Sequence, residues 1–420
     1  MKPLMVVCAA LALTGCSNRV ARFTVTNPSA YARPDELVVL SRTALSKNGT
    51  VGKNFSVVDE NSQPVVTQLD DLDQDGQWDE ACFLYSFQPN QAVRFSTSNQ
   101  NTDTAASRAH VRLRKKTGDT AFGPDLPKET MPLHNPPTDF GRQPLPLYLT
   151  EGPAWENDKV AFRLYFDTRN GKDIFGKTAP ALVMDTVGAN LNASYHQLAP
   201  WGMDILHAGN SLGAGSLAFT VNGIDSAIRL GGEKVLSETY EKLADGPLRA
   251  VFRIVYQFTI KEKPVTITEQ ISTWGGQYFY QSIVSTAGLP EGVALQTGVA
   301  NFYENVPAQF IQDSTAAFYS YGRQSENHDN LGMAILVPAA TFTAVDSLPK
   351  EIVKGKMTYV QKIYDSYIIG QKISDNRPAI YRFCVGWEKS DALFATREGF
   401  ARYLSREAEN FSKPLILTWK

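Results

Sequence analysis

The stretch that decides the fold runs from Ala250 to Ser285 and contains AVFRIVYQFTI (250–260), VTITEQIST (265–273) and YFYQSIVS (278–285). Each segment is rich in β-branched and aromatic residues and is bounded by Gly, Pro, Lys or Glu, as strands are. Because only short turns separate the segments, they predict an antiparallel meander. Several such strands in one chain indicate a large β-sandwich.

Strand-like segments continue on both sides of this meander. Lys159–Asp167 alternates with the period of two that is typical of a strand. One helix is predicted over Asp391–Phe411, because its apolar residues share one face, and a last strand over Leu415–Trp419. Shorter strands, split by Asn, Pro, Asp and Gly, fill residues 21–97. We therefore expect an N-terminal β-sandwich (16–97), a linker and packing segment (98–150) and a large β domain (151–420).

The first residues resemble a lipoprotein signal peptide (1–15). Lys2 precedes the apolar run Leu4–Leu13, which is too short to span a bilayer. The run ends in Leu13-Thr14-Gly15-Cys16, which resembles a lipobox, so we expect lipidation of Cys16. The alternative is an ordinary signal peptide with a chance cysteine. Ser17 is not acidic, which by resemblance to the sorting rules of Gram-negative bacteria favours the outer membrane. We expect a lipoprotein of the cell envelope that faces the periplasm, although Ser17 does not determine the leaflet.

Charge and cysteine content restrict the partners. The chain has 41 basic and 43 acidic residues, and this near-neutral balance argues against a nucleic-acid partner. Contact with a membrane is expected only through the lipid anchor.

Cys82 and Cys384 lie in apolar, strand-like segments, where two buried thiols are expected. A disulfide between them is the alternative, because an oxidising compartment would allow it.

An acidic loop at 71–80 (DLDQDGQWDE) is the sharpest local motif. Carboxylates at alternate positions followed by Gly76 are typical of loops that wrap oxygen ligands around Ca²⁺. The expected structural calcium ligands are Asp71, Asp73, Asp75, Gln77 and Asp79. Cys82 stands where an EF-hand has its bidentate Glu, and a strand follows, so the loop is not an EF-hand. A metal-free acidic turn is the equal alternative.

A first polar group begins at Trp155-Glu156-Asn157 and continues to Arg169. Arg163, Tyr165 and Asp167 share one face of a strand by the period of two. Such a row requires either solvent or a polar ligand, and Arg is the natural clamp for a carboxylate. The alternative is an exposed sheet face with salt bridges.

A second polar group holds two of the five histidines, His196 and His207. Histidine is a suitable general base near neutral pH. Trp201 is a candidate stacking platform for a sugar ring, and Asp204 and Asn210 are candidate substrate ligands. A structural role for each histidine is the alternative. A weaker third group, around Tyr321 and Arg323, is predicted to line a groove.

These motifs carry a family resemblance. WENDK (155–159), DIFGK (173–177), WGMD (201–204), GNSLGAG (209–215) and QLDDLD (68–73) resemble an uncharacterised lipoprotein family of glycan-degrading bacteria. The resemblance covers nearly the whole mature chain. It implies an all-β fold: a small N-terminal β-sandwich plus a large C-terminal β-supersandwich like that of galactose mutarotases, with one C-terminal helix. Fold analogy by itself does not give function.

The resemblance and the polar groups together favour an envelope lipoprotein that acts on uronate-containing oligosaccharides. We expect a mutarotase, epimerase or lyase that needs no catalytic cofactor. His196 or His207 would be the base, Arg163 or Arg169 the carboxylate clamp, and Tyr165 the acid. Trp155, Glu156, Asn157 and Asp167 are expected to bind substrate. The alternatives are a non-catalytic glycan-binding lipoprotein and an envelope scaffold.

Overall fold

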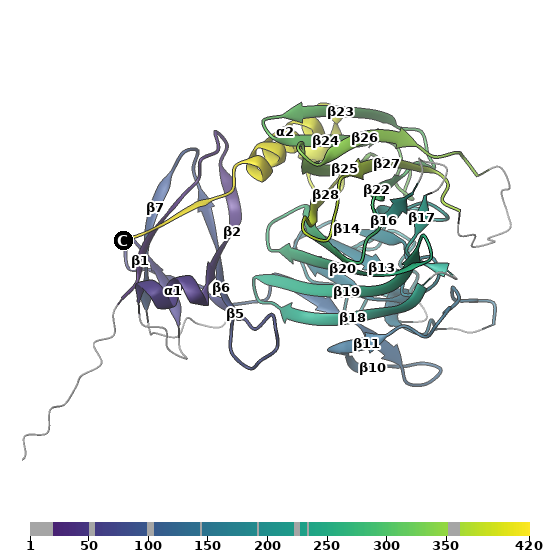
Figure 1. Ribbon diagram of the computed structural model, residues 1–420, viewed down its shortest axis with the longest axis horizontal. Helices are drawn as coiled ribbons and strands as arrows, with labels where there is room; N and C mark the ends of the chain where they lie inside the picture. The colour runs from purple at the N-terminus through teal and green to yellow at the C-terminus, as the bar shows by residue number, and fades with distance from the viewer. Residues whose placement is uncertain are drawn as a thin grey trace, which may run out of the picture.

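The computed structural model describes residues 20–49, 55–98, 105–142, 145–190, 193–221, 227–232, 235–351 and 362–420. The predicted signal peptide and Cys16 lie outside the described residues. Among the residues described, no helix combines the length and the apolar character needed to cross a membrane. The fold is all-β, with an N-terminal sandwich, a larger β domain and a C-terminal helix (Figure 1), so the predicted fold class is confirmed.

The N-terminal domain consists of two small antiparallel sheets. One has the order β29-β1-β7-β3-β4 and the other β2-β6-β5. The bounds are β1 Arg22–Thr26, β2 Arg33–Ser41, β3 Ser56–Asp59, β4 Pro64–Val65, β5 Gln68–Asp70, β6 Glu80–Phe87, β7 Ala92–Ser98 and β29 Ile416–Trp419, with a short helix α1 at Arg42–Asn48. Phe23, Phe83 and Phe95 pack between the sheets.

The C-terminal strand belongs to this N-terminal domain. β29 pairs antiparallel with β1, with Phe23 opposite Trp419. Figure 1 shows the chain end returning across the molecule to this sheet. The prediction that placed Leu415–Trp419 in the large domain is therefore corrected. Strand pairing between the two chain ends is not encoded in local sequence.

The large domain is built on a nine-stranded antiparallel sheet with the order β11-β18-β19-β20-β21-β28-β25-β24-β23. Its strands are β11 Lys128–Thr130, β18 Val235–Asp245, β19 Arg249–Ile260, β20 Lys263–Trp274, β21 Phe279–Ala287, β23 Val306–Gln312, β24 Thr315–Gly322, β25 Leu331–Pro338 and β28 Ala379–Trp387. The meander predicted over Ala250–Ser285 is confirmed as β19–β21.

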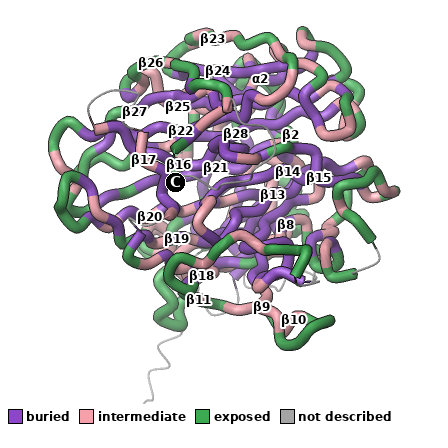
Figure 2. The backbone as a smooth tube through the Cα atoms, turned by 90° about the vertical axis from the view of Figure 1, so that its right-hand side faces the viewer, coloured by how far each residue is buried: buried purple, intermediate pink, exposed green. Residues whose placement is uncertain are grey.

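Two five-stranded sheets pack against one face of the large sheet, with the orders β15-β14-β13-β12-β8 and β17-β16-β22-β27-β26. Their strands are β8 Ala109–Arg112, β12 Ala154–Asn157, β13 Val160–Leu164, β14 Lys172–Lys177, β15 Gly202–Asp204, β16 Ala214–Thr220, β17 Ile228–Arg229, β22 Ala294–Ala300, β26 Phe342–Ser347 and β27 Ser366–Gln371. The buried layer between the sheets is continuous, and exposed backbone lies mostly at the rim (Figure 2).

The segment predicted as a linker, 98–150, is part of the large domain. β8 pairs with β12, and Val111 and Leu113 are buried in the main core. A two-stranded ribbon of β9 (Arg114–Lys116) and β10 (Phe122–Asp125) follows, and β11 extends the nine-stranded sheet. The many Thr, Ser and Pro residues concealed these short strands.

The predicted helix is divided in two. A 3₁₀ turn at Ala392–Ala395 precedes helix α2 at Arg397–Ser412. The break falls at Thr396, whose side chain accepts a hydrogen bond from the backbone N–H of Gly399 and so caps α2. Phe400 and Leu404 of α2 pack on the outer face of the large sheet.

Candidate functional site

The first polar group forms strand β12, which is buried on both faces. Trp155 is 0% exposed, and its ring packs 5.6 Å from that of Phe162 and 5.1 Å from that of Phe252. Glu156 is paired with Lys177, and Asn157 donates to the carbonyl of Gln277 over 2.9 Å. Because all three side chains are buried and engaged, the prediction that they bind substrate is corrected: they hold the sheets together.

Arg163 on β13 is the centre of a buried network. Its side chain is 1% exposed, and Nη2 lies 2.7 Å from Asp173 and 3.0 Å from Asp204. Nη1 donates to the hydroxyl of Tyr195 over 3.1 Å and to Glu151 over 3.3 Å, and Nε donates to Asp173. All three guanidinium nitrogens are therefore engaged, so Arg163 is not a clamp for a substrate carboxylate.

Tyr165 lies inside the same network. Its hydroxyl donates to Asp173 over 2.8 Å, and its ring lies between the guanidinium groups of Arg163 and Arg169, 4.3 and 3.7 Å from the ring centroid. Burial raises the pKa of Tyr165 well above its usual value. A buried hydroxyl that already donates to a carboxylate is not placed to protonate a substrate, so the predicted acid role is corrected.

Asp167 and Arg169 also face each other rather than solvent. The two side chains form an ion pair, and Arg169 Nη2 lies 2.7 Å from Glu151. Both side chains are at least nine-tenths buried. The row of Arg, Tyr and Asp that the period of two predicted is present, but it forms a buried ion network. The prediction that Asp167 and Arg169 bind substrate is therefore corrected.

His196, in contrast, lies at the surface directly above this network. Its side chain is 60% exposed, and Nδ1 is 3.6 Å from Asp204 Oδ2. Asp204 is buried at the end of β15 and bonded to Arg163. Burial and the charge of Arg163 lower the pKa of His196, so the ring is neutral at pH 7. Burial and the charge of Asp173 raise the pKa of Asp204 well above its usual value. An exposed neutral imidazole beside a buried acidic side chain has the form of a general base.

His207 forms a second exposed pair with a carboxylate. Its side chain is 50% exposed, and Nδ1 lies 3.7 Å from Glu326 Oε1. The hydroxyl of Tyr303 donates to the same oxygen over 2.5 Å, and the edge of Phe302 packs on the imidazole at 4.5 Å. Burial and the Glu326 carboxylate raise the pKa of Tyr303, which keeps its proton at neutral pH.

The two pairs belong to one surface. The backbone N–H of Glu326 donates to the carbonyl of Ile205, next to Asp204, over 3.0 Å. The charge of Glu326 also acts to raise the pKa of both Asp204 and His196. We call His196, His207, Tyr303 and Glu326 the histidine surface. A cavity of about 250 Å³ adjoins it and is lined by Tyr195, His196 and Thr150.

Other predicted residues divide between this surface and the interior. Trp201 is half-buried near Phe175 and Tyr195, beside the histidine surface. Arg323 is exposed and donates to the carbonyl of His328, on the same loop as Glu326. Asn210 bonds Glu351, and Tyr321 is buried with its hydroxyl on the carbonyl of Phe394, so neither lines an open groove.

Tyr303 and Glu326 were not among the predicted site residues. Glu326 belongs to a polar loop that the sequence marked weakly, and Tyr303 lies in a short aromatic stretch, Phe302-Tyr303. The two segments are far from His196 in the chain, and only the tertiary fold, including the hydrogen bond from Glu326 to Ile205, brings them together. No local motif could have identified them.

The acidic loop places carboxylates close together. Oxygens of Asp71, Asp73 and Asp79 lie within 4.8 Å of one another. Backbone N–H groups of the loop already donate to them, including that of Gly76 to Asp71 over 2.8 Å. The backbone N–H of Gln77 donates to Asp75 over 2.7 Å. The arrangement can accept a hard cation such as Ca²⁺, and calcium there stays a prediction.

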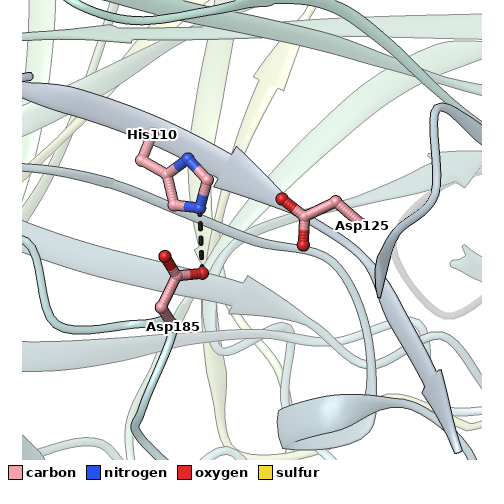
Figure 3. Close-up of side chains that lie close together, drawn as sticks. All are labelled: His110, Asp125 and Asp185. Carbon is pink, nitrogen blue, oxygen red and sulfur yellow. Dashed lines mark hydrogen bonds and ion pairs between the residues drawn. The ribbon is translucent and has the colours of Figure 1, made fainter. Parts of the chain in front are cut away.

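A further charged cluster was not predicted. His110 on β8 lies 2.8 Å from Asp245 through Nδ1. Its Nε2 lies 3.2 Å from Asp185, and Asp125 is nearby (Figure 3). Arg114 pairs with Asp125 and Asp185, 2.5 and 2.7 Å away. These cations already neutralise the carboxylates, so the cluster joins β8, β10 and β18 as an ion network and is a poor metal site.

Cys82 and Cys384 are both buried free thiols. Burial raises the pKa of each thiol. Cys82 belongs to β6 of the N-terminal domain and Cys384 to β28 of the large domain. The alternative of a disulfide between them is therefore wrong.

The chain belongs to the family described as Domain of unknown function (DUF4861), whose model matches residues 25–416. It is similar to "Uncharacterized protein P7" of Formosa agariphila, with 23% identity over 443 residues, 98% of this chain and 97% of that protein. The expected membership of an uncharacterised family is thus confirmed in its coarse form.

Two solved structures from Enterococcus faecalis are also similar, each at 10% identity over 96% of this chain. One is an α-mannosidase from strain V583, with a TM-score of 0.47, and the other a protein of glycosyl hydrolase family 38, with a TM-score of 0.49. This chain spans about half of each, 46% and 47%.

Proposed function

We propose that this protein acts on uronate-containing oligosaccharides by proton transfer at the histidine surface, as an epimerase or lyase. The observation that carries the proposal is the pair of exposed histidines, which lie 3.6 and 3.7 Å from the acidic side chains of Asp204 and Glu326, with a cavity lined by His196. The expected uronate substrate rests on the family resemblance of the sequence. A histidine can remove the hydrogen on the carbon next to a carboxylate only where a cation stabilises the negative charge that develops on the carboxylate.

The proposed chemistry assigns one role to each exposed group. Neutral His196 takes the proton from C5 as the C5–H bond breaks, and the electron pair moves into the sugar carboxylate. Arg323, the exposed guanidinium on the neighbouring loop, neutralises that charge. In a lyase the electron pair then returns to form the C4=C5 double bond as the C4–O bond breaks, and His207 donates its proton to the leaving oxygen. In an epimerase His207 returns a proton to the opposite face of C5.

Three variants test this assignment on a panel of uronate oligosaccharides. His196→Gln and His207→Gln should each lower kcat by a factor of about 10² or more, the usual contribution of one acid or base. His134→Gln changes another exposed histidine, outside the histidine surface, and should keep full turnover. Full turnover by both site variants would refute the assignment. Measurable affinity without product in mass spectra would favour the non-catalytic glycan-binding function.

We also propose that the protein is an envelope lipoprotein anchored through Cys16. The mature protein should then partition into detergent and carry a diacylglycerol mass at its N-terminal cysteine. Cys16→Ser should release the protein from the membrane fraction. A wild-type N-terminus without lipid would exclude the anchor.

A further inference from the structure

A cavity of about 770 Å³ lies between the two domains, on the face of the large sheet opposite to the histidine surface. The N-terminal domain contributes β2 to its wall, with Arg33 and Glu36. The large domain contributes β19–β21 and β28, with Trp274 and Arg382, and α2 contributes Asn410. Figure 1 shows α2 and the chain that follows it passing between the domains on one side.

Four buried polar atoms in this wall have no hydrogen-bond partner among the described residues. They are Arg33 Nε, Trp274 Nε1, Arg382 Nη1 and Asn410 Oδ1. All four residues are more than nine-tenths buried. Buried polar atoms without partners reduce stability, so proteins rarely keep them unless water or a ligand satisfies them. The four residues that carry these atoms all line this cavity, which indicates a polar occupant.

The partial contacts of the two arginines leave them able to bind an anion. Arg382 Nη1 faces Glu407 at 3.6 Å, an ion pair that is too long to be a hydrogen bond, and its Nε donates to Gln281 over 3.2 Å. Arg33 bonds the carbonyl of Lys413 through Nη2, and its Nη1 is 4.0 Å from Glu36. Each therefore retains a donor that is not used in a short bond.

The chemistry of the wall selects an oxygen-rich ligand. Three of the unpaired atoms are donors and one is an acceptor, which suits a molecule with a carboxylate and hydroxyl groups. The rings of Trp274 and Phe411 lie 5.7 and 5.3 Å from the Arg382 guanidinium and give the cavity an apolar side for a sugar ring. Glu36 and Glu407 disfavour a second negative charge. The volume is within the range of about 300–1,000 Å³ for small-ligand sites.

We propose that this interdomain cavity is a second binding site, for a mono- or disaccharide with a single carboxylate, held by Arg33, Arg382, Trp274 and Asn410. The ligand bridges the two domains and fixes their arrangement. This site does not depend on the proposed reaction, because the histidine surface belongs to a different sheet.

Ligand-observed NMR and calorimetry on the full chain, with glucuronate, galacturonate and neutral glucose as probes, test this site. A uronate should bind and raise Tm, and glucose should bind at least about tenfold more weakly, because it lacks the charge-assisted hydrogen bond. Trp274→Phe and Arg382→Lys should weaken uronate binding by about tenfold. Arg94→Lys and His134→Gln, both at exposed sites, should leave this binding unchanged.

Several results would overturn the proposal. Equal affinity for glucose and uronate would show that the site does not recognise a carboxylate. Unchanged uronate binding in Trp274→Phe and Arg382→Lys would show that uronate does not bind in this cavity. A crystal structure soaked in uronate with only water on the four atoms would show that water alone satisfies them. Circular dichroism of each variant checks that a loss of binding is not a loss of fold.

Discussion

The Arg163 network and the histidine surface are neighbours that differ in one property, access to water. Both are dense in Arg, Tyr, Asp or His, and Asp204 belongs to the contacts of both. The network is buried with its guanidinium nitrogens engaged, whereas the two histidines are half exposed or more. A polar motif in a β protein can therefore be a buried ion network and not a ligand-binding row. In the proposed function Arg163 is a positioning residue, which holds Asp204 under His196.

The largest expected effect tests the buried side of this comparison. Arg163→Met should lower the free energy of unfolding by about 3–5 kcal/mol, because it leaves Asp173 and Asp204 buried without their cation. Urea denaturation followed by circular dichroism measures the change. Arg323→Met removes an exposed arginine and serves as the matched control, with an expected change of about 0.5 kcal/mol or less. Equal stability of the two variants would show that the network is not structural.

A smaller effect is expected at the acidic loop, far from both regions. If the loop binds Ca²⁺, calcium at 100 times its Kd should stabilise the protein by about 2.7 kcal/mol through mass action. Differential scanning calorimetry with calcium and with EDTA measures this as a shift in Tm. Asp71→Asn combined with Asp73→Asn should abolish the shift. An identical Tm in calcium and in EDTA would show that the loop is a metal-free acidic turn.

The His110 cluster gives a pH-dependent effect that is smaller again. Burial acts to lower the pKa of His110, but the hydrogen bond and charge of Asp245, with Asp185, outweigh it and raise that pKa above its usual value. Lys242 and Arg114 face the same carboxylates. Because the folded pKa is raised, the stabilisation is complete below about pH 6.5 and is lost as pH rises through the folded value.

His110→Gln should remove this pH dependence. The difference in unfolding free energy between wild type and variant should therefore shrink as pH rises from 6 to 9. Urea titrations at fixed ionic strength measure the difference. A constant difference over this range would show that His110 does not titrate there.

The smallest expected effect on stability is at the exposed side of the comparison. His196→Gln should change the free energy of unfolding by about 0.5 kcal/mol or less, because the ring is exposed and its contact with Asp204 is long. Thermal denaturation measures the change. A loss similar to that of Arg163→Met would make His196 part of the structural network and would weaken its proposed role as a base.

The sequence predicted the regular parts of the fold well. Strands β19–β21 are long and bounded by clear turns, so their pattern was strong. The short strands β10 and β11 were missed because so few residues each carry little periodicity. The prediction that Trp155, Arg163 and Tyr165 contact substrate was wrong. A sequence motif shows the type of side chain but not whether that side chain is buried. His196 and His207 were singled out because two of the five histidines fall within twelve residues, and their role as acid and base stays a prediction.

Local sequence by itself determined the β class, the central meander, the C-terminal helix and the two histidines, because periodicity and residue chemistry are local properties. Only the tertiary structure decided three further features. It paired β29 with β1, it buried Arg163 beneath His196, and it brought Tyr303 and Glu326 to His207. Each of these joins residues far apart in the chain, and such contacts depend on how whole sheets pack.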